Sequence, residues 1–442
     1  MRFSRSWLVA VALVAVTLVF AACGDDDDGS TSNGGSDAAD SGAPAGGASQ
    51  ETIDVWKEYA GGTEGEADSS LEPLKVGMVV QKGGTPSFPE MEAAADAGVE
   101  FVNKHMGGAD GHPIELVKCF MQAEEDGQKC GSQLLKADVP VGMFTIAVVG
   151  NTSLYETINA RIPLIDSVTT LPIDTTTENV YNFAGGAPAI LYAKAADGAE
   201  LASGGRAAIV SVDNAGGKFA TEDITVPSFK SLGVEHTKPV YFPDDATTPD
   251  MVSALQAAGG ADADVILLEP SGPQHCNSLY DAMNQLGITG TPVVATSICG
   301  APSFVDDAAN GAPEGWRIWG FVLNSYIESD PEVKAYKEIM ESGGQGEFSD
   351  VGFSATVLRD LSLLVRFANN LGADGWTPEG FKKEIRSYDG RAFLAPGRMS
   401  CSDPVLADQP GLCGREAVGA SFTDGEWQTI DPVAVNTEIF GQ

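Results

Sequence analysis

The chain alternates short apolar runs with segments whose apolar residues recur at helical spacing. In the first half, four apolar runs predict buried strands: Leu74–Val80, Ile114–Cys119, Phe144–Val149 and Ile162–Ile165. Ser87 and Glu90 have the spacing of a capping box that opens a helix, and a second helical segment runs from Glu124 to Lys136. Strands that alternate with helices predict a parallel, doubly wound sheet.

A second strand–helix set begins near Gly185 and has the same organisation. Its predicted strands are Ala207–Val212, Pro239–Phe242, Asp264–Leu268 and Pro292–Thr296. Helices are predicted near Asp250–Ala258 and over Cys276–Leu286. Because each strand stops in a loop rich in Gly, Ser, Asn or Pro, the two sets predict two lobes that face one another across a cleft.

The remainder of the chain is predicted to complete these lobes. Trp316–Leu323 has the pattern of a strand that returns to the first lobe. Val351–Leu371 is the longest amphipathic helix, and Gly372 stands where a C-cap glycine belongs. Ala417–Phe422 and Trp427–Ile430, with a Thr-Asp-Gly turn between them, predict a small hairpin.

Two apolar runs of the first set end in small polar residues. Ala147–Gly150 leads into Asn151, Thr152 and Ser153, and Ile162–Ile165 leads towards Thr169 and Thr170. In an open α/β sheet, ligands bind outside the carboxyl ends of the strands. Ordinary turns have the same composition, so a ligand site and a pair of turns both remain open at this point.

The first 22 residues have the pattern of a secretion signal. Arg2 and Arg5 form a positive region, Trp7–Phe20 is almost wholly apolar, and two alanines precede Cys23. The segment resembles a bacterial lipoprotein signal, in which this cysteine is acylated and becomes the mature N-terminus. Phe20 departs from that pattern, since Leu is commoner there. An ordinary secreted protein or an uncleaved anchor is the alternative.

Residues 23–73 are expected to form the acylated cysteine and a flexible tether. The Gly-, Ser-, Ala- and Asp-rich tract up to Gln50 cannot bury a core. Its run of four Asp residues lacks the spaced ligands of a calcium loop, so no metal site is predicted. Val55, Trp56 and Tyr59 can dock as a short helix, and the role of 51–73 stays open.

The chain is strongly acidic, with 62 acidic and 26 basic residues. Two of the arginines and none of the acids lie in the first 22 residues, so the mature chain would be more acidic still. This charge argues against nucleic acid and anionic lipid as partners. It does not identify the ligand.

Seven cysteines are present, and acylation of Cys23 would leave an even number. In an exported protein, disulfides persist. The order along the chain suggests the pairs Cys119–Cys130, Cys276–Cys299 and Cys401–Cys413, although six cysteines allow other connectivities. Zinc is disfavoured because the chain has only four histidines and no Cys-x-x-Cys motif.

Four segments carry a family resemblance: Lys75–Val80, the Gly-Gly-x-x-Gly-His-Pro-Ile segment from Gly107, Val149–Ser153 and Ile162–Ser167. Their order and spacing, from about Leu74 to Arg391, resemble the type I periplasmic binding proteins. The likeness is to the branched-chain amino-acid branch, the substrate-binding proteins of ABC importers. A disulfide near Cys119 and Cys130 is common in that family.

The resemblance implies an α/β fold of two Rossmann-like lobes, joined by a three-crossover hinge, that close on a small ligand. It implies no chemistry, so we expect no cofactor, no metal and no enzymatic activity. The expected domains are the signal peptide (1–22), the tether (23–73), lobe 1 (74–184 plus 307–390) and lobe 2 (185–306 plus 391–442).

The resemblance also implies the ligand contacts. Hydroxyls and backbone amides of the first lobe would grip a carboxylate, because oriented donors stabilise a buried anion. The first-lobe candidates are Asn151, Thr152, Ser153, Thr169 and Thr170. The second-lobe candidates are Asn214, Ser271 and Ser297. Phe88 either stacks on the ligand or packs against its own helix.

The second lobe departs from the amino-acid pattern of the family. Ser297 stands where an acidic residue usually meets the ligand ammonium, and Gly216-Gly217-Lys218 replaces an aromatic residue. Burial of an unpaired ammonium is costly. Either Asp213 or Glu269 therefore substitutes, or the ligand is not an α-amino acid. Amino acids, amides, urea-like compounds and small carboxylates remain open.

We expect a monomeric solute-binding lipoprotein that delivers a small ligand to ABC permease subunits. Lipidated Cys23 would be its only membrane contact, at the outer face of the cytoplasmic membrane. A ligand-sensing receptor component on the same fold, which binds an amide or a small carboxylate, is the alternative. His275 beside Cys276 suggests a nucleophilic pair, but a cysteine bonded to Cys299 cannot act as a nucleophile.

Overall fold

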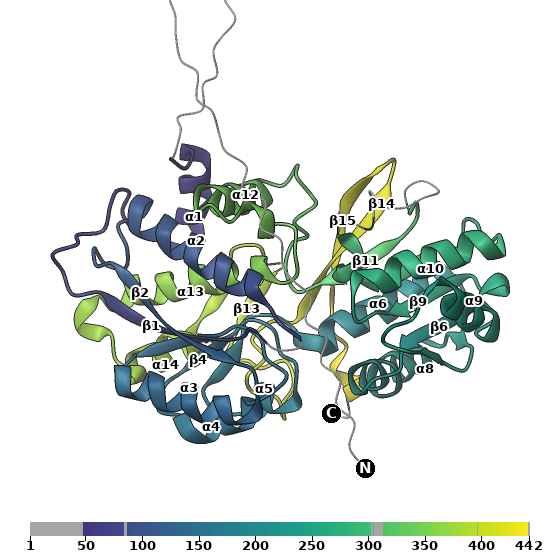
Figure 1. Ribbon diagram of the computed structural model, residues 1–442, viewed down its shortest axis with the longest axis horizontal. Helices are drawn as coiled ribbons and strands as arrows, with labels where there is room; N and C mark the ends of the chain where they lie inside the picture. Colours follow the sequence, from purple (N-terminus) through teal and green to yellow (C-terminus); the bar gives the residue numbers. More distant parts are fainter. Residues whose placement is uncertain (1–46, 84–85, 302–303, 305–312, 396, 441–442) are drawn as a thin grey trace, which may run out of the picture. The chain divides into compact units, whose positions relative to one another are not determined.

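A computed structural model describes residues 47–83, 86–301, 304, 313–395 and 397–440. The predicted signal peptide, Cys23 and the tether up to residue 46 lie outside these residues. The described part contains two large β-sheets with helices on both faces of each (Figure 1), and one two-stranded sheet. No helix in these ranges is long and apolar enough to cross a membrane.

The first large sheet is entirely parallel, with the order β2-β1-β3-β4-β5. Its strands are β1 (Leu74–Gln81), β2 (Ile114–Met121), β3 (Val141–Phe144), β4 (Leu164–Asp166) and β5 (Val180–Asn182). Nearly every residue of β1 is buried, because helices cover both faces of the sheet. Alternate side chains of the strand therefore enter different cores.

Helices α2 (Pro89–His105) and α13 (Ser354–Leu371) pack on one face of this sheet, where they share a core with Val76 and Met78. Helices α3 (Glu124–Ala137) and α4 (Asn151–Ile158) pack on the other face with Val79 (Figure 1). Further helices in this part include α5 (Pro172–Thr176), α12 (Pro331–Ser342) and α14 (Pro378–Ser387).

The second large sheet is mixed, with the order β15-β14-β11-β10-β9-β6-β7, and β8 also pairs with β6. Its strands are β6 (Arg206–Val212), β7 (Glu235–His236), β8 (Val240–Phe242), β9 (Val265–Glu269), β10 (Val293–Thr296), β11 (Arg317–Gly320), β14 (Glu416–Thr423) and β15 (Glu426–Ala434). Strands β14 and β15 form the antiparallel hairpin that the sequence predicts, with positive φ at Asp424 and Gly425 in the turn.

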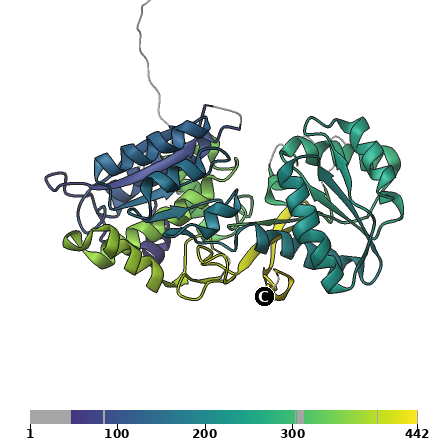
Figure 2. The same ribbon diagram turned by 90° about the horizontal axis from the view of Figure 1, so that it is seen from below.

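Helices α6 (Gly186–Ala202) and α8 (Val226–Leu232) cover one face of the second sheet, and α9 (Thr248–Ala257) and α10 (Pro273–Leu286) cover the other. Helices on both faces of this sheet are visible in Figure 2. Between α6 and α8 lie α7 (Ala215–Lys218) and a π-helix (Phe219–Thr225). The two-stranded sheet pairs β12 (Asp389–Arg391) with β13 (Arg398–Ser400). Short 3-10 helices include Ser297–Gly300 and Gly346–Phe348.

The segment before the first strand contains a docked helix, α1 (Gln50–Ala60). Trp56 is fully buried and Tyr59 nearly so, and both join the core that α2 and α13 form. The Tyr59 hydroxyl donates a hydrogen bond of 2.7 Å to Glu332 on α12. The expectation that these aromatic residues dock as a short helix is confirmed.

The predicted strand Phe144–Val149 is wrong beyond Phe144. Strand β3 ends at Phe144, and Val148 is exposed. Beyond Phe144, Gln81 at the end of β1 holds the segment: Gln81 N–H donates to Ile146 O (2.9 Å), and the side-chain Oε1 of Gln81, rather than a strand carbonyl, accepts from Val148 N (2.8 Å). Residues 145–149 are therefore a loop rather than a strand.

The predicted return of Trp316–Leu323 to the first lobe is also wrong. Strand β11 pairs with β10 on one side and with β14 on the other, so it belongs to the second sheet. An apolar strand pattern does not identify the sheet in which the strand pairs. The lobe boundaries as a whole stay a prediction.

The three predicted disulfides are confirmed: Cys119–Cys130, Cys276–Cys299 and Cys401–Cys413. Each joins residues close in sequence within one part of the fold. Cys276–Cys299 connects α10 to the 3-10 helix that follows β10. Gly372 ends α13 with a positive φ of 64°, as expected of a C-cap glycine.

Candidate functional site

A pocket with a volume of about 590 Å³ is formed by residues of both large α/β layers and of the segments that connect them. Its walls come from the start of α2, the start of α10, the 3-10 helix after β10, and the chain that leads into α13. The lining residues are Ser87, Phe88, Glu90, Ser271, Gly272, Pro273, Ser297, Ile298, Ala301, Tyr326, Glu347, Asp350, Val351, Gly352 and Phe353.

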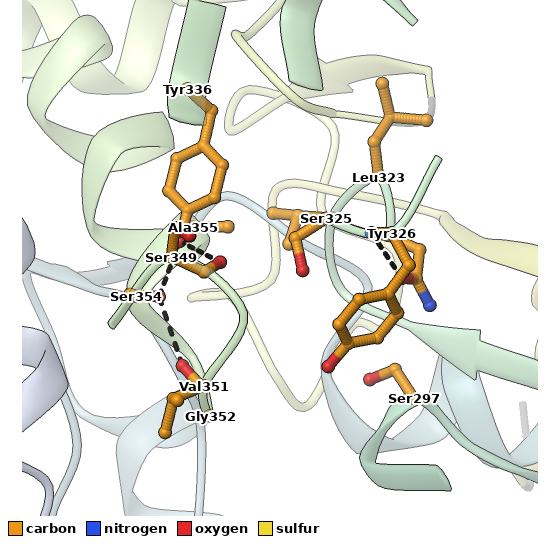
Figure 3. Close-up of a pocket in the computed structure, with 12 residues that line it drawn as sticks. Ser297, Leu323, Ser325, Tyr326, Tyr336, Ser349, Val351, Gly352, Ser354 and Ala355 are labelled. Atoms are coloured by element: carbon orange, nitrogen blue, oxygen red, sulfur yellow. Dashed lines mark hydrogen bonds between the residues drawn. The ribbon is translucent and has the colours of Figure 1, made fainter. Parts of the chain in front are cut away.

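A smaller cavity of about 40 Å³ adjoins this pocket and shares Ser297, Tyr326, Val351 and Gly352 with it. Figure 3 shows Ser297 and Tyr326 on one side of the cavity and Val351 on the other. The Tyr326 hydroxyl donates to the backbone oxygen of Asp350 (3.1 Å), and burial and the nearby Asp350 carboxylate raise the pKa of that hydroxyl. This bond joins the chain after β11 to the chain before α13.

Three sequence-derived candidates line the pocket: Phe88, Ser271 and Ser297. Asn214 does not line it. Its Oδ1 accepts from Gly217 N (2.9 Å) as the N-cap of α7, and its Nδ2 donates to Asp244 Oδ1 (3.0 Å). Ser271 Oγ donates to the same carboxylate oxygen (2.8 Å), so Asp244 links Asn214 to Ser271, which lines the pocket.

The first-lobe candidates lie together, but none of them lines the pocket. Asn151 is buried and its Nδ2 donates to Asp174 Oδ1 (2.8 Å). The Thr170 backbone N–H donates to Asp174 Oδ2 (2.9 Å), so one carboxylate holds the ends of both loops. This arrangement fixes the two loops against each other at the carboxyl edge of the sheet.

The hydroxyls of the remaining candidates differ in their availability. Ser153 Oγ donates to the backbone oxygens of Glu124 (2.7 Å) and Gly150 (3.2 Å), which gives it a structural role. Thr152 is exposed and Thr169 is half-buried, and neither hydroxyl has a hydrogen-bond partner among the described residues. Their part in ligand binding stays a prediction.

The two acids suggested as substitutes for the family's ammonium-binding residue are already paired. Lys218 Nζ lies 2.5 Å from Asp213 Oδ1, on the surface. Lys194 is fully buried, and its Nζ lies 2.6 Å from Glu269 Oε1. Neither Asp213 nor Glu269 lines the pocket.

The pocket instead presents three carboxylates that the sequence did not reveal as site residues: Glu90, Glu347 and Asp350. The predicted capping box, which gave Glu90 a structural role, does not form. Ser87 Oγ accepts from Gly83 N (3.0 Å), and Phe88 is the N-cap without a side-chain bond. The signal that could have located Glu90 was its place just after the loop that leaves β1.

The described residues include no group of three or more His, Cys, Asp or Glu side chains that could hold a metal ion. His275 is buried, where its Nδ1 accepts from Ser271 N (3.1 Å) and its Nε2 lies 2.9 Å from Asp244 O. These contacts assign the proton to Nε2. Cys276 is in a disulfide, so His275 orders the Ser271 turn rather than activates a thiol.

Residues 73–409 match the sequence model of a family described as periplasmic binding protein. This match covers most of the chain, and the chain belongs to that family. A sequence search of curated proteins gave no match.

Solved structures share the fold at low sequence identity. A branched-chain amino-acid ABC transporter protein from Thermus thermophilus with bound valine has a TM-score of 0.67 at 14% identity, over 84% of this chain and 97% of its own. An ABC transporter solute-binding protein from R. palustris in complex with 4-hydroxybenzoate has a TM-score of 0.64 at 16% identity, over 82% of this chain and 98% of its own. A leucine-binding protein from Thermotoga maritima has a TM-score of 0.62 at 15% identity, over 82% of this chain and 99% of its own. The fold is that of the type I periplasmic binding proteins.

Proposed function

We propose that this protein is the solute-binding component of an ABC importer and captures a small polar ligand in the pocket lined by Phe88, Ser271 and Ser297. The observation that carries the proposal is the pocket itself, of about 590 Å³, with walls from the N-terminal ends of α2 and α10. A pocket of this size suits a small organic ligand. Membership of the periplasmic binding protein family supports the same role outside the cytoplasm.

Closure of the two lobes on the ligand is the proposed mechanism. A ligand that contacts both lobes stabilises the closed conformation, in which the lobes are close together, and the permease recognises that conformation. The chain between β11 and α13, which carries Tyr326 and Asp350, is placed to respond because it lines the pocket and connects the two layers. This connecting chain would therefore move with lobe closure and contribute to binding.

Two classes of ligand are represented among the structural relatives, amino acids and aromatic carboxylates. The pocket wall favours a ligand that bears an amine. Its lining residues include three carboxylates and no Lys, Arg or His side chain. Asp350 is paired with Lys337, so an aromatic carboxylate there would face the like charges of Glu90 and Glu347. An amide or small carboxylate bound by a sensor on the same fold is the second candidate.

We further propose that Cys23 carries the lipid anchor and that α1 is the point at which the tether joins the folded protein. Tyr59 and Trp56 bury this helix in the core beside α2, α12 and α13, which would keep the anchor attached to the first lobe. Replacement of Cys23 by Ser should release the protein from membranes into the soluble fraction. Continued retention would contradict the lipid anchor.

A thermal-shift screen of the mature protein against amino acids, amides and small organic acids tests the proposed function. A ligand that binds only the folded state raises the melting temperature, by an amount that grows with the logarithm of its concentration relative to its dissociation constant. We expect stabilisation by at least one amino acid. Stabilisation by aromatic or aliphatic acids alone would favour the second candidate, and no shift with any compound would contradict solute binding in this pocket.

A further inference from the structure

The three carboxylates of the pocket are not equivalent. Glu347 is exposed, and Asp350 has a cation already, because Lys337 Nζ lies 3.2 Å from its Oδ1. Glu90 is 4% exposed, and no lysine or arginine of the described chain pairs with it. Burial raises the pKa of the Glu90 carboxyl, although backbone hydrogen bonds, including one from Phe353, oppose the rise. An ionised carboxylate without a cation is costly at such a position.

The fold keeps space for this carboxylate at the pocket wall. Glu90 lies in the first turn of α2, and Gly352 of the chain before α13 approaches its side chain closely. A Cβ atom at position 352 would lie 2.3 Å from Glu90 Oε1, and the φ of Gly352 is +59°, which favours glycine. Both residues line the pocket. Glycine at 352 therefore permits a buried carboxylate to reach the wall.

A role in helix α2 alone does not account for this burial. An acid in the first turn of a helix interacts favourably with the helix dipole, and it does so when it is exposed. Glu92, in the same turn, is partly buried but has cations beside it, because it forms ion pairs with Lys82 and Lys118. Glu90 has no such partner and lies instead beside Phe353 at the pocket.

We propose that Glu90 is a ligand-binding residue whose carboxylate pairs with a protonated nitrogen group of the solute held in this pocket. The proposal rests on the proposed function and deepens it: it assigns the cation contact to the first lobe, on α2. Ser297, Asp213 and Glu269, the positions considered from the sequence, do not supply this contact. The apolar part of the ligand would lie against Phe88, Ile298 and Phe353.

Isothermal titration of the mature protein with matched probes tests the proposal. Each standard amino acid is compared with the amine-free acid of the same skeleton, and 4-hydroxybenzoate is included. We expect binding of at least one amino acid and much weaker binding of its amine-free partner. The substitution Glu90→Gln should lower the affinity for the amino acid by about tenfold or more, because a charge-assisted contact is lost. Glu92→Gln, in the same helical turn but outside the pocket, is the matched control and should bind as the wild type does.

The pH dependence supplies a readout that a structural role would not change. Because a raised pKa leaves part of Glu90 protonated in mildly acidic solution, affinity for the cationic probe should rise with pH and level off once the carboxyl is fully ionised. In Glu90→Gln this rise should be absent. Circular dichroism and the melting temperature of each variant establish that it is folded.

The outcomes separate the two proposals. Absence of binding by every probe overturns the proposed function and this inference together. Equal binding of an amino acid and its amine-free partner overturns the inference and leaves solute binding intact. Unchanged affinity in a folded Glu90→Gln also overturns the inference. If that variant does not fold, the comparison of matched probes on the wild-type protein decides the question without it.

Discussion

Cys276 and Cys299 form a disulfide that ties α10 to the 3-10 helix after β10, and both of these elements line the pocket. Cys276 lies in the first turn of α10, just after Ser271, Gly272 and Pro273. Cys299 lies two residues after Ser297. The bond therefore fixes two parts of the pocket wall against each other.

Replacement of both Cys276 and Cys299 by Ala should lower the free energy of unfolding by about 2–5 kcal/mol. It should also weaken ligand binding, because Ser271 and Ser297 would lose their fixed separation. Urea unfolding and calorimetric titration measure the two effects. Replacement of Cys119 and Cys130, which lie outside the pocket, should reduce stability alone. Equal effects of both double variants on affinity would argue against a specific role for Cys276–Cys299.

Trp56→Ala should strongly destabilise the protein, because Trp56 is fully buried between Phe101 and Phe393. Removal of a buried aromatic side chain costs about 3–5 kcal/mol, from lost burial and the cavity that remains. Urea unfolding with and without the substitution checks this value. Glu58→Ala, at an exposed position of the same helix, is the control and should change stability by less than about 1 kcal/mol. A small effect of Trp56→Ala would mean that α1 is not part of the folded core.

The stability of the protein should depend on pH through Asp166 at the end of β4. Burial, reinforced by Asp174 and Asp360 and opposed by Arg359, raises the pKa of this carboxyl well above its ordinary value. The folded state then holds a proton that the unfolded state releases, so stability falls as the pH rises from the unfolded pKa towards the folded pKa.

Asp166→Asn removes this titration. The variant should gain stability relative to the wild type as the pH rises through that interval, and the difference should be smallest in acid. Thermal unfolding across the pH range provides the measurement. A difference between the two proteins that is constant with pH would show that Asp166 does not titrate on unfolding.

The carboxylate grip predicted for the first lobe is tested by Thr152→Ala with Ser153→Ala. The exposed Thr152 hydroxyl has no described partner, so its removal leaves the fold intact, while Ser153 loses its bonds to the backbone oxygens of Glu124 and Gly150. The melting temperature of the double variant shows whether it is folded. Affinity for the ligand found in the thermal-shift screen should fall by about tenfold or more if these hydroxyls hold its carboxylate. Unchanged affinity would show that Thr152 and Ser153 do not contact the ligand, and would leave the pocket around Glu90 and Ser297 as the proposed site.

Most of the fold could be predicted from apolar periodicity, because buried strands and amphipathic helices leave local patterns. The hairpin at Asp424 and Gly425 and the sequence-adjacent disulfides follow from equally local signals. The sheet in which β11 pairs could not be predicted, because pairing between strands depends on residues distant in the sequence, such as those of β14. The same limit applies to residues 145–149. Their apolar pattern predicts a strand, but they form a loop whose hydrogen bonds to Gln81 are contacts with a distant part of the chain.

The site was only partly predictable for the same reason. Ser271 and Ser297, which were candidates from the family resemblance, follow strands of the second sheet and line the pocket, in agreement with the general rule that ligands bind outside the carboxyl ends of strands. Glu90 looked like a capping residue because Ser87 precedes it by three positions. Its proximity to Gly352 and its burial come from a segment more than half the chain away, and the sequence carries no local sign of that contact.

Amide hydrogen exchange, with and without the ligand that most stabilises the protein, tests the central claim most directly. If the ligand binds in the pocket, exchange should slow in the segments 87–90, 271–273, 297–301 and 347–353, which carry its lining residues. These segments lie in different elements, so their joint protection would indicate closure around one ligand. Protection confined to 151–153 and 169–170, or to none of these segments, would contradict the assignment of the pocket as the binding site.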